Sequence, residues 1–281
     1  MKIGFYPGCS LKGTSREYNE SVLALAKALD IQLEEINDWN CCGATAAHSV
    51  NKELSLSLPA RVLALAEHQG FKEIVVPCAA CYNRLSTTQY ELAQDEEKKK
   101  KVSDIIGMPY DGSVKILNVL QMLQKYSLDT IKSKIVKPFA YKVACYYGCL
   151  LVRPHKILQF DRVEDPQVMD SMMSLIGATP IDWAFKTECC GGGFTESRTD
   201  IVAKLSGNVM KDVNDRGAEA VIVACPMCHS NLDMRRPEID KYLGEDVKVP
   251  VLYITQAIGL ALGIEPETLG LQRHFVKVNT I

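Results

Sequence analysis

The sequence lacks the features that mark several large classes of protein. Its net charge is only −2, with 32 Lys and Arg against 34 Asp and Glu, so it offers no basic field for nucleic acid. It has no apolar run long enough to span a bilayer, and its first residues, MKIGFYPGCS, reach a cysteine before any apolar stretch of signal-peptide length. We therefore expect a cytoplasmic protein without a transmembrane segment and without a nucleic-acid partner.

Familiar redox motifs are missing as well. The chain has neither the CxxCxxCxxxCP run of a ferredoxin, nor a dinucleotide-binding glycine fingerprint, nor a flavin motif. Any electrons that the protein uses must therefore arrive from another polypeptide.

Cysteine, in contrast, is abundant, and its spacing is repeated. A Cys-Cys-Gly triplet stands at 41–43 and again at 189–191, and each has one cysteine upstream and a CxxC pair downstream. The upstream gaps are 31 and 39 residues, and the downstream gaps are 35 and 34 residues. Ten of the eleven cysteines fall into these two copies: Cys9, Cys41, Cys42, Cys78 and Cys81, then Cys149, Cys189, Cys190, Cys225 and Cys228. In a reducing compartment this repeat indicates metal or redox chemistry rather than disulfides.

Both halves of the chain alternate predicted strands with predicted helices. Apolar runs predict strands at 2–7, 31–36 and 73–78 in the first half and at 141–148, 179–183 and 220–225 in the second. Helical periodicity appears at 15–29, 52–69, 165–177 and 199–216, and each half closes with a strand and a helix, at 114–127 and 249–263. We predict an α/β fold of two units, 1–137 and 138–281, each a mostly parallel sheet flanked by helices and related by a pseudo-twofold axis.

Two further segments carry an expectation of their own. The charge run at 95–101 is expected to be a solvated helix end, and the segment from 269 to 279 has no counterpart in the first half.

Sites in parallel sheets lie outside the carboxyl ends of the strands, so each half can gather its five cysteines at one end of one sheet.

Five thiolates exceed the needs of an ordinary site. Four suffice for a structural zinc ion or for a cubane iron–sulfur cluster, and adjacent cysteines are awkward ligands for two corners of one compact cube. The pattern therefore predicts a more open cluster or a bridging thiolate. Zinc in one of the two sites is the alternative.

The motifs YPGC ending at Cys9, YYGC ending at Cys149 and CPMC ending at Cys228 carry a resemblance. Nearly the whole chain resembles the B subunit of heterodisulfide reductase, a family with two CCG domains. The resemblance implies that each set of five cysteines binds a noncubane 4Fe–4S cluster, and that a disulfide is reduced in a cleft between the two. It also implies that the iron–sulfur C subunit of such a complex is the electron donor, docked on an exposed apolar patch, with the flavin-bearing A subunit behind it.

Three functions stay open from the sequence. The favoured one is the catalytic subunit of a disulfide reductase, because splitting a disulfide takes two electrons and yields two thiolates, which suits two one-electron centres. The second is an electron-transfer CCG subunit that serves a quinone or a partner oxidoreductase without cleaving a disulfide. The third is a zinc-stabilised assembly module. The sequence does not choose among substrates: the coenzyme M and coenzyme B heterodisulfide and a protein-borne disulfide or trisulfide fit equally.

Four other residues are weaker candidates. Cys145, the eleventh cysteine, stands inside a predicted strand and is expected to be a buried apolar thiol. His155 and His229 lie near cluster cysteines and could protonate a departing thiolate, although a hydrogen-bonded or solvent-facing imidazole is the simpler interpretation. Arg153 could pair with an anionic substrate group, and solvation at a helix end is its alternative.

Overall fold

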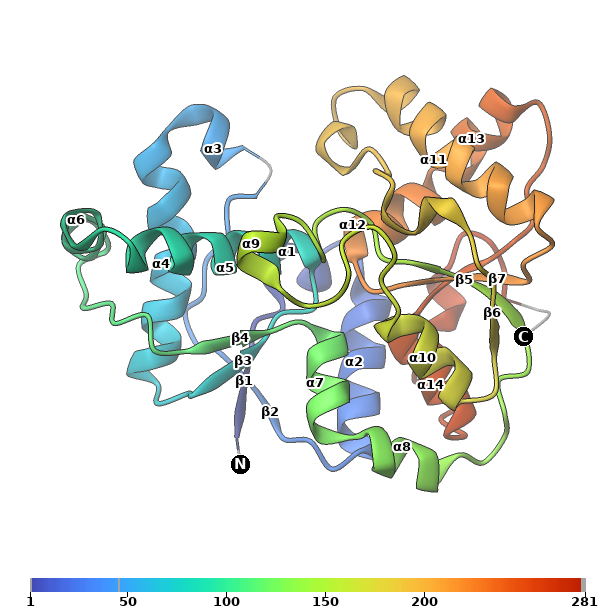
Figure 1. Ribbon diagram of the computed structural model, residues 1–281, viewed down its shortest axis with the longest axis horizontal. Coiled ribbons are helices and arrows are strands. Elements are labelled where there is room, and N and C mark those ends of the chain that lie inside the picture. The colour runs from blue at the N-terminus through green and yellow to red at the C-terminus, as the bar shows by residue number, and fades with distance from the viewer. Residues whose placement is uncertain (1, 45, 279–281) are drawn as a thin grey trace.

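Two four-stranded parallel sheets form the framework of the protein (Figure 1). The computed structural model describes residues 2–44 and 46–278. The strand order is β2-β1-β3-β4 in the first sheet and β6-β5-β7-β8 in the second, and every pairing is parallel. Since the second order repeats the first, element for element, the predicted α/β fold with two related parallel sheets is confirmed.

The strands are short, and those at the centre of each sheet are largely buried. Those of the first sheet are β1 (Ile3–Phe5), β2 (Leu33–Glu35), β3 (Glu73–Val75) and β4 (Lys115–Leu117). Those of the second are β5 (Lys142–Tyr146), β6 (Thr179–Pro180), β7 (Ala220–Val223) and β8 (Val251–Tyr253). All lie inside the predicted segments and end earlier, because the residues that follow each central strand leave the ladder to form the loops that carry cysteines.

Helices cover the first sheet. They are α1 (Gly8–Lys12), α2 (Arg16–Ala28), α3 (Ala47–Val50), α4 (Lys52–His68), α5 (Ala79–Ala93), α6 (Glu96–Ile106), α7 (Val119–Tyr126) and α8 (Leu128–Lys134). The charge run at 95–101 opens helix α6 rather than ending a helix, which corrects the prediction. The reason is local: the Asp95 carboxylate accepts the backbone N–H of Lys98 (3.0 Å), and acidic Glu96 and Glu97 occupy the positively polarised first turn.

The second half repeats this arrangement with additions. Its helices are α9 (His155–Leu158), α10 (Val168–Leu175), α11 (Thr199–Asp215), α12 (Pro226–His229), the π-helical turn η3 (Ser230–Met234), α13 (Arg236–Leu243) and α14 (Ile254–Ala261). Short 3-10 turns are η1 (Ala184–Thr187), η2 (Gly192–Phe194) and η4 (Leu271–Arg273). Across the described part of the chain, no helix has both the length and the apolar character that crossing a membrane requires.

The two halves share one hydrophobic core, and α2 of the first half packs against α14 of the second near the middle of the molecule (Figure 1). The rings of Tyr18 and Tyr253 stack there with centroids 3.9 Å apart, and both side chains are fully buried. The hydroxyls of Ser21 and Thr255 hydrogen-bond across the same contact (2.7 Å), and the Tyr253 hydroxyl donates to Glu17 Oε1 (3.2 Å). The halves are therefore joined by buried, specific contacts.

Residues 264–278, which we call the strap, return from the second half to the first. Arg273 forms an ion pair with Glu20 on α2 (2.9 Å). Gly270 has a φ of +75°, and a Cβ built on it would lie 2.7 Å from Glu17 Cα, so the turn needs glycine both for its backbone and for the close approach. The strap therefore fastens residues near the end of the described chain to the first long helix.

The stacked tyrosines predict a large stability effect. Tyr18→Ala should cost about 3 kcal/mol, because it removes a fully buried ring from the contact between the halves. The thermal midpoint of anaerobically purified protein should then fall by roughly 6–12 °C. Leu23→Ala, on the same helix but 41% exposed, is the matched control and should cost less than about 1 kcal/mol. Equal losses from the two variants would contradict the role given to the stack.

Candidate metal centres

Central strands deliver the cysteines to one end of each sheet. β1 ends at Phe5 and leads to Cys9 in α1, and β3 leads to Cys78, which precedes the first residue of α5. In the second half, β5 leads to Cys149 and β7 leads to Cys225, which precedes the first residue of α12. The second cysteine of each CxxC then lies in the first turn of its helix. The predicted placement of the cysteines beyond the carboxyl ends of the strands is what the structure has.

The first set forms a chain of sulfur contacts. The Sγ atoms of Cys9 and Cys41 are 4.0 Å apart, and those of Cys42 and Cys81 are 3.2 Å apart. Thiol–thiol interactions between Cys78 and Cys81 and between Cys41 and Cys42 also shift the pKa values of these groups. All five cysteines of the first half thus interact through one another.

The second set repeats the contacts and meets the first. The Sγ atoms of Cys190 and Cys228 are 3.7 Å apart, and the Cys149 thiol hydrogen-bonds to Cys189. Interactions with the thiols of Cys228 and, across the boundary between the halves, Cys78 lower the pKa of Cys225. The two sets therefore approach each other at the first cysteine of each CxxC pair.

Burial divides each set into a closed and an open end. The thiols at the contact between the halves, Cys78 and Cys225, are each 3% exposed. At the other end Cys9, Cys41 and Cys189 are exposed and Cys149 is half-buried. A molecule from solvent can therefore reach the sets only from the side of the upstream cysteines and the Cys-Cys pairs.

The triplet glycines bring backbone N–H groups to sulfur. The N–H of Gly43 donates to Cys41 Sγ (3.4 Å), and the N–H of Gly191 donates to Cys189 Sγ (3.3 Å). Another glycine makes room for a thiol: Gly148 has a φ of +64°, and a Cβ on it would lie 3.0 Å from Cys228 Sγ. Such N–H groups and clearances are the environment that thiolate clusters require.

An aromatic pair supports each Cys-Cys loop in the same way. The Tyr6 hydroxyl donates to the carbonyl of Asn40 (2.8 Å), and the Tyr146 hydroxyl donates to the carbonyl of Glu188 (2.6 Å). Both acceptors directly precede the cysteine pair. Trp39 packs against the Tyr6 ring and Trp183 against the Tyr146 ring, with centroids 5.6 and 6.2 Å apart. These matched contacts hold both loops at the same place relative to their sheets.

Hydrogen bonds between thiols separate their acidities. Cys149 donates to Cys189, so the pKa of Cys149 is raised while the pKa of Cys189 is lowered to about 6, the latter helped by the backbone N–H groups of Gly191 and Gly192. In the first half, hydrogen bonds from Cys42 and Cys9 lower the pKa of Cys41, and the bond to Cys41 raises the pKa of Cys9. At the open end of each set, one thiol therefore has a lowered pKa.

The spread of the sulfurs tests which metal group each set suits. In a tetrahedral zinc site, Zn–S bonds of about 2.3 Å place the sulfurs roughly 3.8 Å from one another. Within residues 2–44 and 46–278, no three cysteine sulfurs lie mutually within 4.8 Å. Each set is therefore more open than a zinc tetrathiolate, and its five sulfur donors and N–H groups fit an iron–sulfur group with several metal ions.

The weaker candidates lie away from these contacts. Cys145 is fully buried in the core, as predicted, and burial raises its pKa. Arg153 pairs with Glu164 (2.8 Å) and also donates to Thr187, so its guanidinium is already engaged. His155 is exposed at the start of α9. The solvent-facing interpretation of His155 is the one that the structure has.

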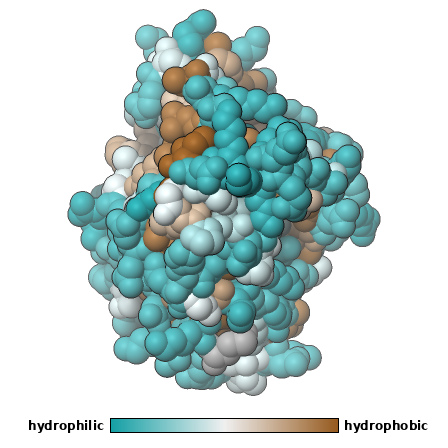
Figure 2. Space-filling model, turned by 90° about the vertical axis from the view of Figure 1, so that its left-hand side faces the viewer, coloured by the Kyte–Doolittle hydropathy of each residue, from teal (hydrophilic) through white to brown (hydrophobic). Residues whose placement is uncertain are grey.

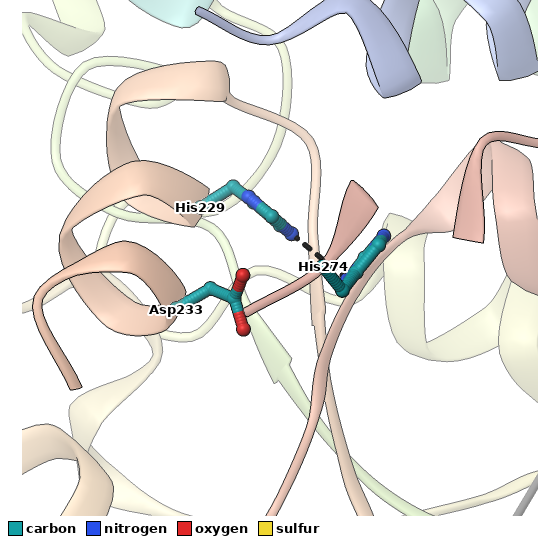
Figure 3. A group of neighbouring side chains, drawn as sticks. All are labelled: His229, Asp233 and His274. Atoms are coloured by element: carbon teal, nitrogen blue, oxygen red, sulfur yellow. Dashed lines mark hydrogen bonds between the residues drawn. The ribbon is translucent and has the colours of Figure 1, made fainter. Parts of the chain in front are cut away.

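His229 belongs to a buried polar cluster that the sequence did not reveal. It lies within 4.8 Å of Asp233 on η3 and of His274 on the strap, measured between their nearest nitrogen and oxygen atoms (Figure 3). Burial lowers the pKa of His229 to about 3, so its ring is neutral at pH 7 and is not the imidazolium acid that could protonate a thiolate. The hydrogen-bonded interpretation of His229 is therefore the one that the structure has.

Gln256 decides whether this cluster can hold a metal ion. Its amide oxygen accepts the Tyr253 N–H (2.9 Å) and its nitrogen donates to the Leu269 carbonyl (3.0 Å), so an N–H group faces His274 Nε2 (2.8 Å). His274 Nε2 therefore accepts, and the proton of this ring lies on Nδ1, 3.3 Å from His229 Nε2. His229 Nε2 also lies 3.1 Å from the Val251 carbonyl, which can only accept, so His229 donates its own Nε2 proton to that carbonyl. A protonated Nδ1 has no lone pair for a metal ion. We conclude that these residues form a hydrogen-bonded knot.

The knot fastens the strap. The Asp233 carboxylate accepts the backbone N–H groups of Phe275 (2.8 Å) and Val276 (3.1 Å), and His229 stacks on Tyr253 with ring centroids 4.4 Å apart. The segment without a counterpart in the first half thus supports the turn that follows Cys228. His274 lies 45 positions after His229, so no local pattern could have identified the knot.

The fold and the site together define a class: a duplicated α/β protein with a five-thiol site at the end of each sheet. The cysteine-rich domain family model, CCG, matches residues 3–86 and 143–233, one match in each half. The chain belongs to this family, with two CCG domains. The predicted resemblance to the B subunit of heterodisulfide reductase is confirmed by its relatives.

Two relatives match over nearly the whole chain. The 8-methylmenaquinol:fumarate reductase membrane anchor subunit of Wolinella succinogenes is 31% identical, over 98% of this chain and 97% of the relative. The B subunit of the ferredoxin/F420H2-dependent CoB-CoM heterodisulfide reductase of Methanosarcina acetivorans is 28% identical, over 98% and 94%. Both relatives are parts of oxidoreductases.

A solved structure shares the fold. A hypothetical protein from Helicobacter pylori superposes with a TM-score of 0.80 at 13% identity. The match covers 100% of this chain and 53% of that one. At this identity the likeness concerns the fold alone.

The thiol acidities predict an order of alkylation in the reduced apoprotein. At pH 7, iodoacetamide should modify Cys41 and Cys189 before Cys9 and Cys149, because the thiolate is the nucleophile and its formation is favoured only in the first pair. The rate at Cys189 should fall as the pH drops below about 6. Mass spectrometry of timed samples measures the order. Equal rates in the native protein, as expected in denaturant, would contradict the assignment.

Proposed function

We propose that the chain is the iron–sulfur catalytic subunit of a heterodisulfide reductase-like complex, which reduces a disulfide at two noncubane 4Fe–4S clusters. The observation that carries the proposal is the pair of five-thiol sets, one at the end of each sheet, that approach each other at Cys78 and Cys225. The ligands are the ten cysteines of the two sets, five from each half. The proposed domain boundary lies between residues 137 and 138, and the proposed compartment is the cytoplasm.

The stoichiometry of disulfide reduction suits two adjacent sites. One disulfide takes up two electrons and two protons and gives two thiols, with cleavage of the S–S bond. The clusters would supply one electron each and would bind the two sulfurs that separate. A single one-electron site would leave a thiyl radical, so the contact between the two sets is what makes the pair useful.

The residues of the chain would position and shield this chemistry. The exposed Cys9, Cys41 and Cys189 mark the side from which a disulfide would approach. The buried Cys78 and Cys225 would keep water away from the contact between the sets. Backbone N–H groups of the triplet glycines would stabilise the charge on the thiolates.

The open spacing of the sulfurs supports clusters over zinc. A zinc ion in one set would have to draw together thiols that are now more widely spread than its ligands. The five donors of each set also exceed the four that zinc takes. Both facts favour a group with several metal ions in each half.

One relative gives a reason to test a second function. The chain is 31% identical to one subunit of a fumarate reductase, and the name of that enzyme mentions no disulfide. In this alternative the two clusters would pass electrons to a quinone or to a partner oxidoreductase. The open ends of the two cysteine sets would then exchange electrons without binding substrate sulfur.

The proposed electron donor is the iron–sulfur C subunit of such a complex, with the flavin-bearing A subunit behind it. Val50 on α3 and Leu54 on α4 follow the first Cys-Cys pair and are 74% and 41% exposed. Figure 2 shows apolar surface gathered near the top of the molecule, at the height where Figure 1 places α3. We propose this surface for docking of the iron–sulfur donor, because electrons would enter close to the first set.

Metal content tests the proposal first. Anaerobically purified protein should contain about eight iron and about eight labile sulfide per chain, as two 4Fe–4S clusters require. Cys42→Ser and Cys190→Ser should each lose disulfide turnover, while Cys145→Ala, which alters the one cysteine outside the sets, should keep it. About two zinc ions without labile sulfide would end the cluster proposal. Parent-rate turnover in either serine variant would overturn the two-site mechanism.

Rapid-freeze EPR then separates the two functions. During turnover with a disulfide whose sulfur carries an isotope label, a paramagnetic signal broadened by that label should appear, because substrate sulfur binds iron. A labelled disulfide that leaves every signal unchanged, together with electron transfer to a quinone, would favour the alternative function.

A further inference from the structure

Asn231 is a buried amide beside the second cysteine set. It lies in the π-helical turn η3, three residues after Cys228, and its relative exposure is 0%. π-helical turns are rare and occur frequently at functional sites. The side chain therefore stands inside the protein, one turn beyond a proposed ligand.

Hydrogen bonds fix the orientation of the Asn231 amide. Its nitrogen Nδ2 lies 3.0 Å from the Cys190 carbonyl oxygen, which can only accept, and its oxygen Oδ1 lies 3.1 Å from the Thr195 hydroxyl. The N–H side of the amide thus faces the Cys-Cys loop. Nδ2 is also 3.7 Å from Cys190 Sγ, within the range of an N–H···S hydrogen bond. One N–H can serve the carbonyl and the other the sulfur.

Among its described residues, the first half lacks this arrangement. The amide beside its Cys-Cys pair is Asn40, whose nitrogen donates to the carbonyls of Cys41 (2.9 Å) and Leu58 (2.9 Å), so both N–H groups are taken by oxygen. The position three residues after Cys81 holds Arg84, whose buried Nε has no hydrogen-bond partner among the described residues. The two sets therefore differ in the environment of the second cysteine of the pair.

An N–H group aimed at a thiolate changes a reduction potential. Reduction adds negative charge to an iron–sulfur group and its thiolates, and a hydrogen bond to the sulfur stabilises that charge more than it stabilises the oxidised state. The bond therefore raises the potential. The effect is largest where water is excluded, and Cys190 is 6% exposed.

We propose that Asn231 is a positioning residue that raises the reduction potential of the iron–sulfur group held by the second set, through an N–H···S hydrogen bond to Cys190. The inference rests on the proposed function, since it needs clusters in both sets. The consequence is an order of reduction, because the amide favours reduction of the iron–sulfur group in the second half.

Three variants test the hydrogen bond. Asn231→Leu keeps the size of the side chain and removes both N–H groups. Ser206→Ala is the matched control, because the Ser206 hydroxyl donates to the same Cys190 carbonyl (3.0 Å) and leaves the sulfur alone. Thr195→Val removes the hydroxyl beside the amide oxygen and keeps the bond to sulfur. Iron and labile sulfide are measured in each variant before an EPR-monitored redox titration.

The expected result is selective. In Asn231→Leu the midpoint of one EPR signal should move to a more negative potential, and that signal should be the one that Cys190→Ser removes. The other midpoint should stay, and Ser206→Ala and Thr195→Val should leave both unchanged. Unshifted midpoints in a fully loaded Asn231→Leu protein, or an equal shift in Ser206→Ala, would overturn the inference.

If the Asn231→Leu protein loses the second cluster, a measurement on the parent protein still tests the hydrogen bond. Protein with nitrogen-15 in the side-chain amides of asparagine should show a nitrogen-15 coupling in the electron spin echo of the signal that Cys190→Ser removes. Absence of that coupling would overturn the inference. A parent protein without labile sulfide would overturn the proposed function and this inference with it, whereas a loaded parent without the coupling would overturn this inference alone.

Discussion

The packing of α2 on α14 is the constraint on which the rest of the structure depends, because it joins the halves where Cys78 and Cys225 approach each other. Each thiol follows a central strand and precedes a helix, so its position is set by backbone rather than by a flexible loop. The Tyr18 ring, stacked on Tyr253, donates its hydroxyl to the carbonyl of Pro77, next to Cys78 (3.4 Å). The packing of α2 on α14 therefore also holds the place where the two thiol sets approach each other.

Much of the fold could be predicted because its signals are local. Strand and helix periods recur in the same order in both halves, and a cysteine that follows a buried strand must lie at the carboxyl end of a parallel sheet. The helix that begins at the charge run 95–101 was harder to predict, because this segment is nearly all polar and has only a weak helical period. Capping by the Asp95 carboxylate decides where the helix begins. Local competition of this kind is decided by single hydrogen bonds.

The sequence was enough to predict which cysteines belong to each site, but not which of them contact one another. Spacing identifies ten cysteines, yet it does not say that Cys78 would touch Cys225, because that contact depends on how two sheets pack. The knot of His229, Asp233 and His274 brings together residues up to 45 positions apart. Pairings over such distances follow from tertiary packing, which a single sequence does not display. The same reason hid the contact of Asn231 with Cys190.

The strap makes residues from far along the chain part of the joint between the halves. Residues 264–278 contact Glu20 on α2 and Asp233 on η3, so they tie the first long helix to the turn beyond Cys228. All ten cysteines of the two sets lie before residue 264. A chain cut at that residue would therefore keep every proposed ligand and lose this fastening, which separates the stability of the joint from the membership of the cysteine sets.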